Sequence, residues 1–249
     1  MPVLPSPAGA TDSWQATAIG RAVPPHRPAL LALALLTLTT AAGGTPPNCP
    51  RAEEITITQD TRLDPACIYR STLRIVAGGV LLDCRGALID ARGRRFGILI
   101  GDRQAVSGVT VRNCRIRGGG NGVFVGRTEP DSVKAAAHDR ETLYRISPHH
   151  VILESISVDG AAGVGIYLDD YVSAVRIIGS AVHGAGSAGI YLEHGSRHNE
   201  IIGSTITGNG YGSFPRYRFG ASRREGIAID ASADNRVQGN HRSEERRVG

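Results

Sequence analysis

The sequence predicts an all-β, single-domain solenoid, in which a short unit of strands and turns is repeated and stacked. Residues 165–180 read GIYLDDYVSAVRIIGS, and residues 189–204 repeat that pattern 24 residues later as GIYLEHGSRHNEIIGS. The 249-residue chain has 32 glycines but only 5% aromatic residues, which favours turn-rich β structure over a helical bundle. A repeat this short, without helical periodicity, must stack on its neighbours to bury its apolar side.

The first segment, residues 1–42, is predicted to be a secretory signal peptide. Its uncharged apolar run at 29–41 follows arginines, precedes small residues and is too short to span a bilayer comfortably. We therefore expect a secreted or periplasmic protein whose mature chain has no stable membrane span. The leader before this run is over-long, and an initiator at Val23 would give a signal of ordinary length.

The four cysteines are interpretable once export is assumed, because disulfides form in oxidising compartments. Cys49 and Cys67 bracket a strand-like segment and are predicted to form a disulfide within an N-terminal cap and first strands at 43–74. Cys84 and Cys114 occupy similar points of neighbouring repeats, so they either pair or fill a core column as thiols. No C-x-x-C motif is present, which argues against a structural zinc site.

The repeat is marked by a G-[IV]-x-[LIV] element followed by a second apolar stretch. Its apolar residues alternate with other residues, and Gly, Asn and Ser interrupt the short strands. Stacked strands lie about 4.8 Å apart, so equivalent side chains should form inward columns. The element begins at Gly97, Gly122, Gly165, Gly189 and Gly226. The predicted inward columns are Ile166, Ile190 and Ile227, and Leu168, Leu192 and Ile229.

These repeats resemble the right-handed parallel β-helix of the pectate-lyase-like superfamily from about Ile55 to Asn240, and 75–93 resembles its first coils. The resemblance implies a β-helix over 75–240. It does not select a function, because the superfamily includes polysaccharide lyases, glycoside hydrolases, uronan epimerases and non-catalytic members.

The last segment, 241–249, departs from the repeat. Arg242 stands where Ile206 stands one repeat earlier, and the tail is rich in charge. We interpret this tail as foreign to the repeat, from a truncated or mis-assembled reading frame, with a genuine polar cap as the alternative.

Two outward columns follow from the alternation of strand side chains. Their aromatic members either bind sugar rings or merely shield the sheet, and their acidic members end successive strands. The first column contains Leu99, Phe124, Tyr167, Tyr191 and Ala228. The second contains Gly101, Gly126, Asp169, Glu193 and Asp230. Phe124, Tyr167 and Tyr191 are thus candidate substrate-binding residues.

The carboxylates allow three functional interpretations and one plain one. Asp169, Glu193 and Asp230 could supply a general acid and base for glycoside hydrolysis. Asp169 and Glu193 could instead bind Ca²⁺, which is the only cofactor suggested, for the recognition of uronates. Asp170 and His194, next along each turn, could transfer protons. The plain interpretation is a polar turn repeated three times.

Two insertions, 127–150 and 211–225, should flank the sheet that carries both columns. In the fold that the chain resembles, such loops wall the substrate groove. Arg223 and Arg224 in the second loop suit the carboxylates of acidic sugars. A lyase would need a strong base, for which Arg197 or Arg223 is the candidate.

The sequence therefore predicts an exported β-helix that binds an acidic polysaccharide, with lyase, hydrolase or epimerase activity as the catalytic options. The alternative is a non-catalytic cell-surface or periplasmic binding or structural module. A net charge of +5 without a basic stripe on a recognisable module argues against a nucleic-acid partner. The sequence does not determine the oligomeric state.

Overall fold

The computed structural model describes residues 48–103, 105–129, 139–210 and 225–243. All of them belong to the second of two units, Thr45–Gly249. The predicted signal peptide at 1–42, Arg223 and Arg224, and the tail after 243 lie outside the described residues.

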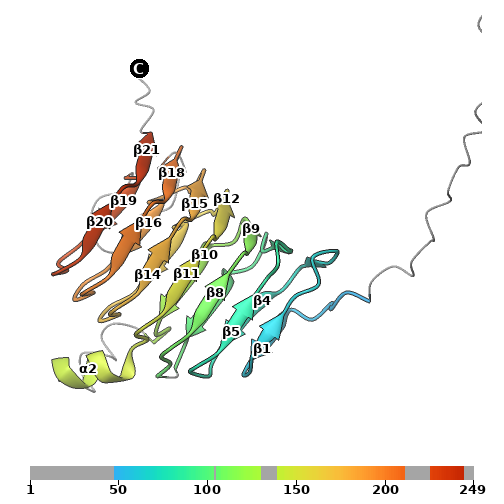
Figure 1. Ribbon diagram of the computed structural model, residues 1–249, viewed down its shortest axis with the longest axis horizontal. Coiled ribbons are helices and arrows are strands. Elements are labelled where there is room, and N and C mark those ends of the chain that lie inside the picture. The colour runs from blue at the N-terminus through green and yellow to red at the C-terminus, as the bar shows by residue number, and fades with distance from the viewer. Residues whose placement is uncertain (1–47, 104, 130–138, 211–224, 244–249) are drawn as a thin grey trace, which may run out of the picture. The chain divides into compact units, whose positions relative to one another are not determined.

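The described chain winds into a three-sided parallel β-helix, in which each coil adds one strand to each of three sheets (Figure 1). Sheet A contains β1 (Glu54–Ile57), β4 (Thr72–Ile75), β7 (Phe96–Gly101), β10 (Asn121–Gly126), β13 (Ile166–Leu168), β16 (Ile190–Leu192) and β19 (Ile227–Ile229). Sheet B contains β2 (Thr61–Arg62), β5 (Leu81–Asp83), β8 (Thr110–Arg112), β11 (Ile152–Glu154), β14 (Arg176–Ile178), β17 (Glu200–Ile202) and β20 (Arg236–Gln238). Sheet C contains β3 (Ile68–Tyr69), β6 (Leu88–Asp90), β9 (Arg115–Arg117), β12 (Ser157–Asp159), β15 (Ala181–His183), β18 (Thr205–Thr207) and β21 (His241–Ser243).

The register pairs equivalent positions of successive repeats, as the sequence predicts. Ile166 lies opposite Ile190, and Leu168 lies opposite Leu192, with none of the four exposed to solvent. They belong to the apolar core that the three sheets enclose. The predicted inward columns are therefore confirmed for these two coils. On the last coil Ile227 and Ile229 keep the register, but Ile227 is half-buried and Ile229 is exposed.

The glycine that begins the repeat element at 97, 122, 165 and 189 is required by close packing rather than by a turn. A Cβ atom on Gly165 would lie 2.2 Å from Cγ1 of Val182 and 2.5 Å from the carbonyl oxygen of Gly189. A Cβ atom on Gly189 would lie 2.4 Å from Cγ2 of Ile206. Real Cβ atoms do not come this close to other atoms. Only glycine therefore lets the backbone at the start of each of these sheet A strands lie against the core side chains of sheet C.

Polar side chains at the corners join each coil to the next. The hydroxyl of Ser180 accepts from the backbone N–H of Ile156, and the hydroxyl of Ser204 accepts from the N–H of Ser180, both at 3.1 Å. At another corner, Oδ1 of Asn199 accepts from the N–H of Val175 at 2.9 Å. These bonds satisfy buried backbone donors where the chain leaves one strand and enters the next.

Both cysteine pairs are disulfides. Cys49 is joined to Cys67, the pair that the sequence predicts. Cys84 is joined to Cys114, which decides between the two alternatives left open for these residues. Both cysteines of the second pair are completely buried, so this disulfide is part of the solenoid core.

The C-terminal end of the solenoid differs from the boundary that the sequence suggests. At the N-terminal end, the first strands predicted within 43–74 are β1 to β3, which form a first coil that pairs with the second. At the other end, β21 continues the repeat past residue 240 by pairing with β18, which places Arg242 beside Ile206. The apolar side chain of Ile229 on this last coil is 43% exposed.

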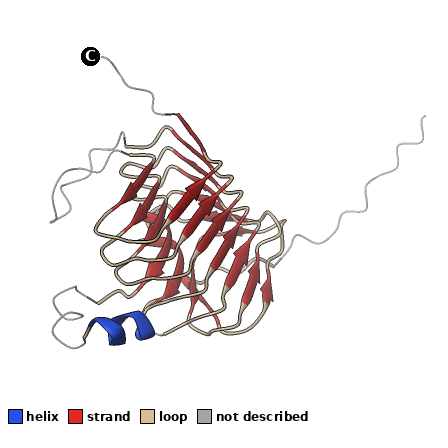
Figure 2. Cartoon of the chain, turned by 60° about the vertical axis from the view of Figure 1, so that its left-hand side comes forward, coloured by secondary structure: helices blue, strands red, loops and turns tan. Residues whose placement is uncertain are grey.

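A helix, α2 (Arg140–Ile146), lies within the first insertion. It stands beside the turns along one side of the solenoid (Figure 2). It begins at Asp139, whose side chain accepts from the N–H of Thr142 and so caps the first turn. Among the described residues, no helix has both the length and the apolar composition that crossing a bilayer requires.

Candidate functional site

The aromatic column on the outer face of sheet A is a packed row of rings. Ring centroids are 4.9 Å apart between Phe96 and Phe124, and 5.2 Å apart both between Phe124 and Tyr167 and between Tyr167 and Tyr191. The side chains lie outside the solenoid core, as predicted, and form an apolar cluster of their own. Phe124 and Tyr167 are nonetheless buried, and Tyr191 is half-buried. Of the three predicted sugar-binding rings, Tyr191 has the most accessible surface.

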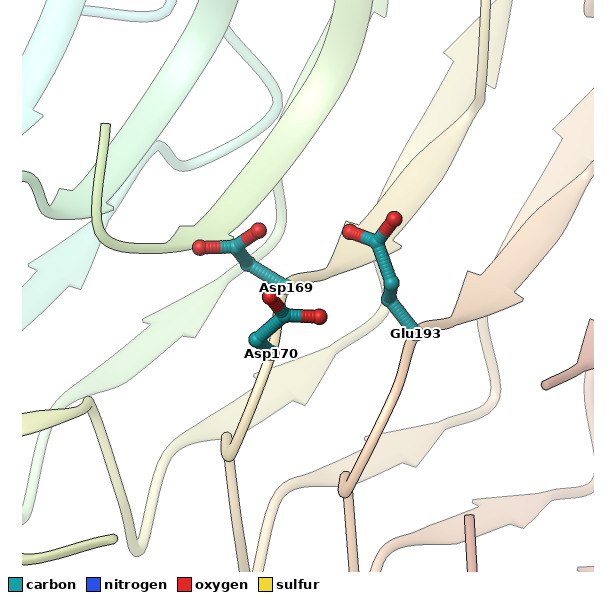
Figure 3. Close-up of side chains that lie close together, drawn as sticks. All are labelled: Asp169, Asp170 and Glu193. Atoms are coloured by element: carbon teal, nitrogen blue, oxygen red, sulfur yellow. The ribbon is translucent and has the colours of Figure 1, made fainter. Parts of the chain in front are cut away.

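Three carboxylates converge beside this row, at the ends of β13 and β16 (Figure 3). Asp169, Asp170 and Glu193 each offer one oxygen, and these oxygens all lie within 4.8 Å of one another. Asp169 and Asp170 are only 4% and 8% exposed, whereas Glu193 is half-buried. We call these three residues the acidic cluster. Its members come from two successive coils, because the repeat places Glu193 one coil after Asp169.

Glycine before the cluster makes room for it. Gly126 ends β10, one coil before Asp169, and a Cβ atom at Gly126 would lie 2.1 Å from Cβ of Asp169. Gly126 in the second outward column therefore contributes to the site, since a side chain there would displace Asp169. The backbone N–H of Arg127 then donates to Oδ2 of Asp169 at 3.0 Å.

Tyrosine hydroxyl groups orient the carboxylates of the following coils. The hydroxyl of Tyr167 donates to Glu193, and the hydroxyl of Tyr191 donates to Oδ2 of Asp230 at 3.2 Å. Burial raises the pKa of Tyr167 far above its ordinary value of 10.0, and the negative charges of Glu193 and Asp169 raise it further. Tyr167 therefore stays protonated as a donor and cannot serve as a base.

We expect Tyr167→Phe to lower the free energy of unfolding at neutral pH by about 1 kcal/mol, the usual contribution of one hydrogen bond. The deficit should shrink as the pH rises above the ordinary tyrosine pKa. There the unfolded wild type gains stability by ionising Tyr167, which the folded state resists and the phenylalanine variant cannot do. Guanidinium denaturation of both proteins at neutral and alkaline pH measures this difference, and a constant deficit would contradict the protonated state of Tyr167.

The donor set of the acidic cluster fits Ca²⁺. Two ligand oxygens that share a Ca²⁺ at about 2.4 Å each can lie at most about 4.8 Å apart, which is the limit that the cluster meets. Carboxylate oxygens are also the ligands that this ion prefers. Asp169, Asp170 and Glu193 would hold it, so Asp170 joins the two ligands that the sequence suggests.

The remaining predicted residues are placed differently. Asp230 lies one coil further along, with Tyr191, and it is not among the residues whose oxygens converge. His194 is exposed, with its ring 6.0 Å from that of Tyr171. Arg197 turns towards α2, where its guanidinium lies 3.5 Å from the ring centroid of Tyr144.

Tyr144 was not predicted from the sequence. Its hydroxyl donates to the carbonyl oxygen of Gly195 at 2.7 Å and so fastens α2 to the turn after β16. With Arg197 and Asp234 it lines a hollow of about 230 Å³. Arg197 therefore has a structural partner on α2.

The comparisons with known proteins identify the fold family. A family model described as a right handed beta helix region matches residues 79–242. A search of curated proteins found no match to the chain, and a search of solved structures also found none. The match covers most of the solenoid. The three parallel sheets of the chain have the stacked arrangement of a right-handed β-helix. The chain therefore belongs to the right-handed β-helix family.

Proposed function

We propose that the protein is exported and binds a carboxylate-bearing polysaccharide at the acidic cluster on sheet A, through Ca²⁺. The observation that carries the proposal is the convergence of Asp169, Asp170 and Glu193 within 4.8 Å beside the half-buried ring of Tyr191. Two disulfides among the described residues support export, because such bonds persist in oxidising compartments.

The charge of the cluster determines the role of the ion. Carboxylates this close repel each other, and a Ca²⁺ ion between them would offset this repulsion and attract an anionic sugar. Ca²⁺ accepts six to eight oxygen ligands, so an ion held by three protein carboxylates has positions left for sugar carboxylate and hydroxyl oxygens. Tyr167 keeps Glu193 directed into the cluster through its hydroxyl group. Tyr191 offers its ring to the apolar face of a neighbouring sugar.

The experiment compares binding of the full chain to immobilised polygalacturonate and to uncharged dextran, with Ca²⁺ and with EDTA. We expect Ca²⁺ to strengthen polygalacturonate binding and to raise the melting temperature, because a ligand of the native state stabilises it. Asp169→Asn and Glu193→Gln should each weaken binding at least about tenfold, as expected when a charged contact is lost. Both should also abolish the Ca²⁺-dependent rise in melting temperature.

Asp159→Asn is the matched control, because Asp159 is exposed on sheet C. It should bind as the wild type does. Polygalacturonate binding that Ca²⁺ does not strengthen, or a loss that is equal in all three variants, would overturn the proposal. The same samples, analysed for unsaturated products and reducing ends, distinguish a lyase or hydrolase from a binding module.

A further inference from the structure

Arginines gather at the corner where sheet C passes into sheet A in the first coils. We call Arg51, Arg70, Arg92 and Arg94 the basic corner. Arg70, Arg92 and Arg94 line a hollow of about 340 Å³ together with Asp90. A second hollow of about 1060 Å³ shares Arg70 and Arg94 with the first and extends to Arg51. The two hollows therefore adjoin, and guanidinium groups line both.

Only part of this positive charge is neutralised. Arg92 makes two hydrogen bonds to the buried carboxylate of Asp90, at 2.7 and 2.6 Å, which hold the pKa of Asp90 below its ordinary value. Arg94 pairs at 3.2 Å with Glu53, but Glu53 is 86% exposed, and such a surface pair is weak. Within the described part of the chain, no ion pair involves Arg51 or Arg70. The corner thus keeps an excess of cations.

The solenoid sets the spacing of these cations. The guanidinium of Arg94 donates to the carbonyl oxygen of Arg70 at 3.4 Å, so the two arginines stand on adjacent coils. The next corner begins with Gly118, where a Cβ atom would lie 2.6 Å from Cγ of Arg92. Glycine there leaves room for the arginine stem. The corresponding corners of later coils, 160–163 and 184–187, contain no charged residue.

We propose that the basic corner is a second binding surface, which holds the carboxylate or sulfate groups of an acidic polysaccharide directly, without a metal ion. Arginine binds such oxyanions through two parallel hydrogen bonds. Successive coils lie about 4.8 Å apart, so a chain running along the solenoid axis meets one or more guanidinium groups at each of the first coils. The class of ligand rests on the proposed function, but the residues are different and no Ca²⁺ takes part.

The test uses the full chain in EDTA, with immobilised polygalacturonate and dextran sulfate as anionic probes and dextran as the uncharged control. The wild type should bind both anionic probes, more weakly as salt is added, and should not bind dextran. The double variant Arg70→Gln/Arg94→Gln should bind at least about tenfold more weakly, because charged hydrogen bonds are lost. Its binding should also depend less on salt.

The matched control is Arg176→Gln/Arg236→Gln. This double variant removes the same charge from the outer face of sheet B, where both arginines pair with Glu200. It should bind as the wild type does. Equal losses in the two double variants would show an effect of net charge alone and overturn the inference, as would equally tight binding of duplex DNA or no binding of either anionic probe.

The two proposals fail separately. Asp169→Asn should leave binding in EDTA unchanged, whereas Arg70→Gln/Arg94→Gln should leave the Ca²⁺-dependent rise in melting temperature unchanged. If Ca²⁺ has no effect but the basic corner still binds the anionic probes in EDTA, the acidic cluster loses its proposed function and the corner keeps its own. The opposite pattern overturns the basic corner alone.

Discussion

Leu168→Ala should lower the free energy of unfolding by about 2 to 5 kcal/mol, the range for emptying a buried leucine site. Leu168 is completely buried and lies between Val125 and Leu192 in the inward column of sheet A. The coils above and below are fixed by backbone hydrogen bonds, so the cavity cannot close by collapse. Denaturant unfolding of the full chain measures the loss.

Thr205→Ala is the control for this substitution, because Thr205 is exposed on sheet C. Its effect should stay within about 0.5 kcal/mol, as for most surface substitutions. Similar losses in the two variants would mean that the assignment of inward and outward faces is wrong.

The Cys84→Ala/Cys114→Ala variant should lose about 3 to 4 kcal/mol of stability, the loop-closure value expected for a disulfide of this span. The two cysteines are 30 residues apart in sequence and join neighbouring coils inside the core. Removing the bond raises the conformational entropy of the unfolded chain. Replacing both cysteines by alanine also removes buried sulfur atoms from the core. Denaturant unfolding under non-reducing conditions gives the difference.

Cys49→Ala/Cys67→Ala provides the comparison, because that disulfide closes a shorter loop of 18 residues at the N-terminal end. It should cost less than removal of the core disulfide. A core disulfide that contributes nothing measurable would indicate that the first coils stay packed in the unfolded ensemble.

The fold could be predicted because the repeat fixes it. The GIYL phrases at 165 and 189 identify which side chain enters the core, and the strands pair them as predicted, Ile166 with Ile190 and Leu168 with Leu192. The two ends of the solenoid were harder to predict from the sequence. The repeat becomes irregular before residue 75, and a charged residue at Arg242 hides a strand that still pairs through its backbone.

For the site, the sequence predicted only which side chains face away from the core, and not how they are arranged there. Alternation placed Tyr167 and Glu193 outside the core, but it could not show that rings on successive coils pack closely enough to bury Phe124 and Tyr167. Nor could it show that Asp170 turns back beside Asp169, since a residue in a turn follows no strand periodicity. Gly126 was the available signal, because a glycine in the column of Asp169 marks a place where space is needed.

The hydrogen bonds from Ser180 and Ser204 to the preceding coil have a consequence for how such a protein can change in length. Each coil gives a hydroxyl acceptor to the coil before it and donates an N–H to the same kind of acceptor on the coil after it, so a coil is a template for another copy of itself. Duplicating or deleting a whole coil would keep the cross-section and every corner bond. A duplication that spans 165–188 would also copy Asp169 and Asp170, and it would lengthen the acidic edge by one step. The number of clustered carboxylates on such a surface can therefore vary by recombination alone, without a new side chain having to be found.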